Sequence, residues 1–153
     1  MKLYQIKTNQ ELPISIEKAW KFFSNPNNLK DITPGEMNFN IISGADKSIF
    51  AGQIIQYKVS PILGINLNWV TEITHVKENE YFVDEQRFGP YALWHHKHFF
   101  TKINGGILME DVVDYKIPLG LIGQFAHFIF VKNKLKKIFK YRHDKLVKLF
   151  GKM

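Results

Sequence analysis

The change of hydrophobic period at Pro118 constrains this chain more than any other feature of its sequence. From Met37 to Pro118, apolar residues largely alternate with polar ones, as is typical of β-strands with one buried face. After Pro118 they recur every three or four residues, which predicts an amphipathic helix of about 28 residues. Its apolar face comprises Phe125, Phe128, Ile129, Leu135, Ile138, Phe139, Leu146 and Leu149. A sheet followed by one long helix must bury its apolar face against that helix.

The remaining segments complete the prediction of a single α+β domain over residues 1–153. Residues 2–12 alternate as a strand, and Ser15 is a candidate N-cap of a short helix. The run SNPNN ends that helix, and a second short turn is expected from Leu29 to Ile32. Six further strands are expected at residues 37–43, 52–59, 65–76, 80–88, 92–103 and 106–117. The pattern therefore predicts a curved, seven-stranded antiparallel sheet wrapped around the long C-terminal helix, with two short helices after the first strand.

The composition excludes several classes of protein. The chain has no cysteine, which excludes disulfides, zinc–thiolate sites and thiol nucleophiles and fits a reducing compartment. No apolar run approaches the roughly 20 residues of a membrane span, and the N-terminus has no apolar core typical of a signal peptide. A cytoplasmic protein is therefore expected. Phosphate-binding glycine loops and nucleophile elbows are absent, and no cofactor is expected.

The net charge of +7 is concentrated in one element. Residues 132–153 contain nine basic residues and one acidic residue, a net charge of +8, so the first 131 residues carry −1. The simplest interpretation is the solvated outer face of the long helix. A second is peripheral contact with an anionic membrane, where basic residues are attracted to the surface. Nucleic-acid binding ranks third, because the body of the domain is not basic and no binding motif is present; we expect no nucleic-acid partner.

The stretch WHHKH, residues 94–98, contains three of the six histidines. Because strand side chains alternate, His96 and His98 should share the inner face with Trp94 and Phe100, while His95 and Lys97 face solvent. The same alternation directs other polar and aromatic side chains of neighbouring strands inward, and it includes Phe88. The inner set that we expect to bind a ligand comprises Tyr57, Trp69, Thr71, Phe82, Asp84, Gln86, Trp94, His96, His98, Phe100, Asp111 and Tyr115.

Four interpretations of His96 and His98 remain open. The first is a buried pair hydrogen-bonded to Asp84 or Asp111, since buried polar groups need partners. The second is recognition of the polar end of a ligand by the same residues. The third is general acid–base catalysis, with His96, His98, Asp84 and Asp111 as candidate catalytic residues. A metal site ranks last, because the aspartates lie on other strands and no spacing guarantees that they converge; none is expected.

The chain also resembles a known superfamily. The runs FVDEQRFGPYALWHHKHFF and GGILMEDVVDYKIPLG, with the order of elements, resemble small stand-alone bacterial domains of the SRPBCC superfamily, the START and polyketide-cyclase group with the helix-grip fold. The resemblance implies a hydrophobic ligand cavity but no particular reaction. We therefore expect binding, or transport, of a small hydrophobic molecule between the sheet and the helix. The alternative is a cyclase, dehydrase or isomerase acting on a polyketide-like or lipid-like substrate through a His/Asp acid–base pair.

Overall fold

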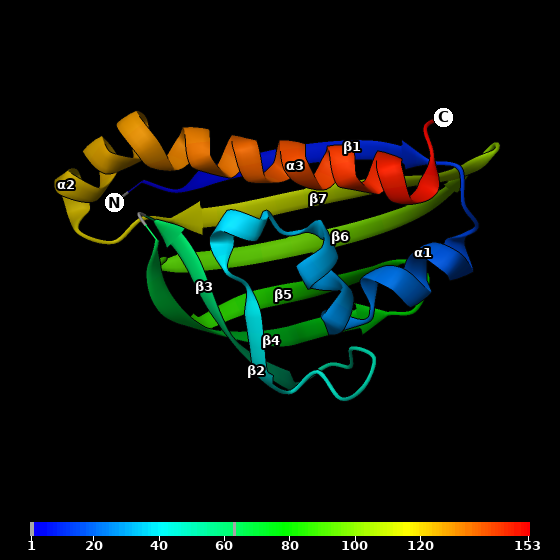
Figure 1. The fold of residues 1–153 in the computed structure, drawn as a ribbon, viewed down its shortest axis with the longest axis horizontal. Helices are drawn as coiled ribbons and strands as arrows, with labels where there is room; N and C mark the ends of the chain where they lie inside the picture. The colour runs from blue at the N-terminus through cyan, green and yellow to red at the C-terminus, as the bar shows by residue number, and fades with distance from the viewer. Residues whose placement is uncertain (1, 63) are drawn as a thin grey trace.

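The fold is a single curved antiparallel sheet of seven strands, seen in a computed structural model that describes residues 2–62 and 64–153 (Figure 1). The strands pair in the order β1-β7-β6-β5-β4-β3-β2, so every strand except β1 lies next to its neighbour in sequence. Their bounds are β1 Tyr4–Leu12, β2 Asn40–Ser43, β3 Gln53–Ile62, β4 Ile65–Lys77, β5 Tyr81–Phe88, β6 Leu93–Ile103 and β7 Gly106–Lys116. The predicted seven-stranded antiparallel sheet is confirmed.

Short helices connect the first two strands. Helix α1, Ile16–Phe23, begins after Ser15, whose side chain accepts a hydrogen bond from the backbone N–H of Lys18. Two 3₁₀ segments follow, η1 Pro26–Ile32 and η2 Gly35–Met37. The second of them delays β2, which begins at Asn40 and not at Met37 as the alternation predicted.

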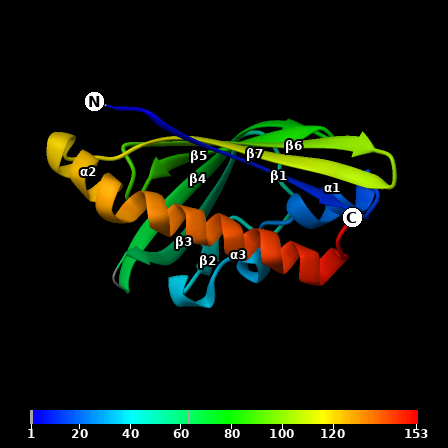
Figure 2. The same ribbon diagram turned by 90° about the horizontal axis from the view of Figure 1, so that it is seen from above.

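The C-terminal helix runs for 31 residues and comprises α2 Gly120–Ala126, a wide π-type turn η3 His127–Val131, and α3 Lys132–Phe150. Helix α3 lies across the concave face of the sheet and contacts β1 on one side and η1 on the other (Figures 1 and 2). Buried side chains of α3 include Leu135 and Leu146, which pack against residues of β7. Among the described residues, no helix is long and apolar enough to cross a membrane.

Two groups of residues that were predicted to face inward are exposed: Phe88 on the sheet, and Phe125, Phe128, Ile129 and Leu149 on the C-terminal helix. Phe88 is 64% exposed, because a register shift between Val70 and Thr71 disrupts the pairing of β4 with the end of β5. Phe125 and Phe128 are 68% and 79% exposed, and Ile129 is also exposed. These three residues precede or lie in the π-type turn, which changes the phase of the helix relative to α3. They also lie where the helix projects beyond the sheet, at the left of Figure 1.

Candidate functional site

Four titratable side chains, three of them buried and that of Asp84 partly buried, meet at the centre of the concave face. Strand pairing places Asp84 of β5 opposite His96 of β6, and His98 of β6 opposite Asp111 of β7. The Nε2 atom of His98 is 2.8 Å from Oδ2 of Asp84, and Nε2 of His96 is 3.1 Å from Oδ1 of Asp111. The register of three neighbouring strands thus brings together the four residues that the sequence offered as catalytic candidates.

A fifth residue, Arg142 of α3, reaches the same cluster from the helix. One of its terminal nitrogens, Nη1, lies 3.7 Å from Oδ2 of Asp111, and its side chain is only 12% exposed. Among the described residues, no group accepts a hydrogen bond from its buried Nε. Sequence analysis missed this residue because it was counted with the basic outer face of the helix. Its spacing from Leu135, Ile138 and Leu146 places it on the inner face instead.

The cluster separates the pKa values of its members. Burial opposes charge on both carboxylic acids, but Arg142 and the imidazoles outweigh this effect and hold the pKa of Asp111 well below its usual range. The charge of His96 and the hydrogen bond from His98 likewise lower the pKa of Asp84 against the effect of burial. Both carboxylates are therefore ionised at neutral pH.

The pKa values of the two histidines shift in opposite directions. Burial and the charge of His98 lower the pKa of His96. Burial also opposes charge on His98, but Asp111 and Asp84 outweigh it and raise the pKa of His98 above its usual range. When His98 is protonated, two carboxylates face two cations, Arg142 and His98, and the buried cluster is close to neutral.

A pH-dependent contribution to stability follows from the raised pKa of His98. A proton that binds more tightly to the folded state than to the unfolded state stabilises the fold. This stabilisation is fully present below the unfolded-state pKa of about 6.5, and it is lost as the pH rises through the folded-state pKa. The His98→Gln variant should therefore lose most stability at about pH 5.5, and its deficit relative to wild type should shrink towards about pH 9. Each unit of pKa elevation contributes about 1.4 kcal/mol to this change.

Urea unfolding across this pH range measures the effect, with the exposed His75 of β4 replaced by glutamine as the control. His75→Gln should show no comparable pH-dependent deficit. A deficit of His98→Gln that is the same at every pH would contradict the assignment of the charged state to His98.

The same residues could also reach a metal ion. Asp84, His96 and His98 each offer one ligand atom, and these atoms lie within 4.8 Å of one another. A dication would, however, add positive charge to a buried cluster in which Arg142 and His98 already balance the carboxylates. This balance favours a network without metal, and the sequence-based expectation of no metal and no cofactor stays a prediction.

A cavity of about 200 Å³ lies between this cluster and the surrounding apolar side chains. Its walls come from the sheet, from η1 and from α3, with His96, His98, Asp84 and Arg142 at the polar end. Tyr57, Trp69 and Thr71 also line it, but their polar atoms bond to one another: Nε1 of Trp69 donates to Oγ1 of Thr71, which lies 2.9 Å from the hydroxyl of Tyr57. The charged atoms that could meet a ligand therefore belong to the cluster, and Asn25, Asn28, Thr33 and Tyr91 add neutral polar side chains to the lining.

Eight of the twelve predicted ligand-binding residues line this cavity: Tyr57, Trp69, Thr71, Phe82, Asp84, Trp94, His96 and His98. Asp111 lies behind the histidines and contacts them without lining the cavity.

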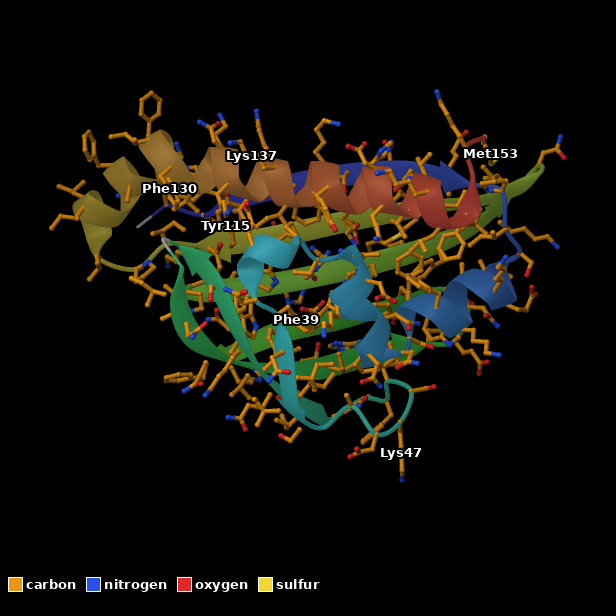
Figure 3. All side chains as sticks on the ribbon, viewed as in Figure 1. Phe39, Lys47, Tyr115, Phe130, Lys137 and Met153 are labelled. Carbon is orange, nitrogen blue, oxygen red and sulfur yellow. The ribbon has the colours of Figure 1, made fainter. Side chains whose placement is uncertain are left out.

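The structure places the other three predicted residues elsewhere. Phe100 is buried in the core that packs against α1, and Tyr115 lies beneath the C-terminal helix, where its hydroxyl is 2.8 Å from His127 (Figure 3). Gln86 binds the backbone N–H and carbonyl of Tyr91, so it holds the turn after β5 in place. Tyr91 also lines the cavity, and strand alternation could not identify it because it lies in a turn.

Solved structures share this fold at low sequence identity. The Zhui aromatase/cyclase from Streptomyces sp. R1128 has a TM-score of 0.75 with 9% identity, covering 97% of this chain and 93% of that chain. A protein from Chromobacterium violaceum has a TM-score of 0.74 with 13% identity, covering 97% and 99% of the two chains. The major latex-like protein 151 from Panax ginseng has a TM-score of 0.70 with 11% identity, covering 97% of both.

No protein-family model and no curated protein matches the sequence. The structural likeness covers almost the whole chain, including the sheet and the long C-terminal helix. The chain therefore shares the fold of these structures, the helix-grip fold that its sequence predicts.

Proposed function

We propose that this protein binds a small, largely apolar molecule in the cavity between the sheet and α3. The observation that carries the proposal is the composition of the cavity, which is mostly apolar and aromatic, with a few neutral polar side chains and one charged cluster formed by Asp84, His96, His98 and Arg142. An apolar pocket with a few convergent polar groups is the usual form of a ligand site.

The volume of the cavity limits the size of the ligand. A cavity of about 150 Å³ lined by apolar side chains holds benzene. The cavity of about 200 Å³ in this protein therefore favours a compact molecule, such as a substituted ring, over a two-chain lipid. Aromatic walls from Trp69, Trp94 and Phe82 suit such a ring.

The polar end of the cavity indicates the chemistry of the ligand's polar group. The buried Nε of Arg142 is a donor that has no acceptor among the described residues, and a donor left without a partner costs about 1–3 kcal/mol. A carbonyl or carboxylate oxygen on the ligand would accept this hydrogen bond. We therefore propose a small apolar molecule that carries such an oxygen.

A second candidate function is acid–base catalysis, which the opposite pKa shifts of the two histidines favour. His96, with its lowered pKa, is suited to accept a proton, while His98, with its raised pKa, is suited to donate one. Both line the cavity. The aromatase/cyclase with the same fold makes a cyclase-type reaction a specific form of this candidate.

One experiment tests the first function and separates it from the second. Native mass spectrometry of freshly purified protein should show an organic adduct that denaturation releases. The released compound is then incubated in large excess with the protein. It should be recovered unchanged if the protein only binds it. Conversion to a product would establish catalysis. Protein without an adduct, together with no binding of single-ring carboxylates such as 4-nitrobenzoate by calorimetry, would contradict the proposed function.

A further inference from the structure

The start of the C-terminal helix exposes large apolar side chains that the ligand cavity does not use. Six of them form what we call the apolar tip: Leu119, Leu121, Ile122, Phe125, Phe128 and Ile129, with exposed fractions between 56% and 82%. Figures 1 and 2 show this segment projecting beyond the strands, and Figure 3 shows Phe130 at the same end of the helix. A cluster of this kind on a soluble domain marks a surface for a partner.

The surroundings of the tip are strongly basic. From residue 116 to residue 143 the sequence contains seven basic residues and no acidic residue. A groove between β1 and the C-terminal helix begins at His127 and Phe128, next to the tip. Its basic lining residues are Lys2, Lys7, Lys132, Lys136, Lys140 and Arg142. Lys137, on the same helix, points away from the sheet (Figure 3).

We propose that the apolar tip inserts into the surface of an anionic bilayer while the flanking lysines contact lipid head groups. Apolar side chains beside a dense set of lysines are the combination that holds helices at membrane interfaces. A second copy of this chain suits the surface less well, because two tips in contact would bring their lysines together. Charge complementarity therefore favours an anionic bilayer as the surface that the apolar tip contacts.

The tip also adjoins the ligand cavity. A second apolar pocket, of about 200 Å³, lies at the base of the tip and is lined by Leu119, Ile122 and Phe130. Tyr91 and Ile138 line both this pocket and the ligand cavity. A ligand that passes between these two residues would reach the tip. Contact of the tip with a bilayer would therefore place the entrance of the cavity at the membrane surface. This last step rests on the proposed function.

Vesicle sedimentation tests the membrane contact without any ligand. Wild-type protein should sediment with vesicles of phosphatidylcholine and phosphatidylserine at low salt, and less with phosphatidylcholine alone or at high salt. The tip variant Phe125→Gln/Phe128→Gln and the charge variant Lys132→Glu/Lys136→Glu should each bind roughly tenfold more weakly. Matched controls are Phe50→Gln and Lys47→Glu, which alter an exposed phenylalanine and a lysine on the loop before β3. Both controls should bind within about twofold of wild type.

Three results would overturn the proposal. Wild-type protein that stays in the supernatant with anionic vesicles would exclude the contact, as would a tip variant that binds like wild type. A dimer in sedimentation velocity that the tip variant dissociates would assign the tip to a second copy. The native adduct should persist in the tip variant, so a failure of membrane binding is distinguishable from a failure of ligand binding.

Discussion

Replacement of Arg142 by methionine should lower the free energy of unfolding by about 3–5 kcal/mol, the usual cost of leaving a buried charge without its partner. Arg142 is the cation of α3 that faces the buried carboxylate of Asp111. Methionine replaces the apolar stem of the arginine side chain but not its guanidinium group, so most of the loss should come from the uncompensated charge of Asp111. Urea unfolding at neutral pH measures the change.

Two further variants isolate the electrostatic cause. Lys148→Met removes an exposed lysine from the same helix and should change stability by less than about 0.5 kcal/mol. The double variant Arg142→Met/Asp111→Asn should regain part of the lost free energy of unfolding, because it no longer has an unpaired buried charge. A double variant that is as unstable as the sum of the two single variants would mean that Arg142 and Asp111 do not interact energetically.

The fold was predictable because each element leaves its own period in the sequence. Alternation identified the seven strands, and the change of period at Pro118 identified the long helix that covers them. The errors fall where a period is interrupted. Phe88 follows a register shift in the pairing of β4 with β5, and Phe125 and Phe128 precede or enter a wide turn of the helix. Such interruptions depend on tertiary packing and leave no clear mark on hydrophobic alternation.

The candidate site was predictable only in part. Alternation placed His96 and His98 on the inner face, but their convergence with Asp84 and Asp111 depends on the register between strands. Register is set by the packed sheet and its turns, so the sequence could not show which residues would lie opposite each other. Arg142 was not predicted for a different reason. A basic residue on a lysine-rich helix is usually exposed to solvent, although the helical spacing of Arg142 placed it on the inner face.

Replacement of Ile55 by tryptophan should weaken ligand binding at least about 100-fold, a loss of about 2.7 kcal/mol or more. Ile55 is 5% exposed and lines the cavity from β3, so an indole ring at this position would take up much of a volume of about 200 Å³. The neighbouring Ile54, 49% exposed, faces the other side of the strand and provides the matched control. Ile54→Trp should bind the ligand as wild type does. Titration calorimetry with the compound released from the native protein measures both affinities.

The stability of the same two variants tests whether the cavity has room for the ring. A side chain forced into a filled core costs about 1–3 kcal/mol or more, whereas a ring that enters an existing space gains contacts and costs less. Ile55→Trp should therefore stay folded, with a free energy of unfolding within about 1 kcal/mol of wild type. Strong destabilisation would indicate that the side chains close the cavity in solution. Normal stability with undiminished affinity would place the ligand elsewhere, with the basic groove between β1 and the C-terminal helix as the next site to test.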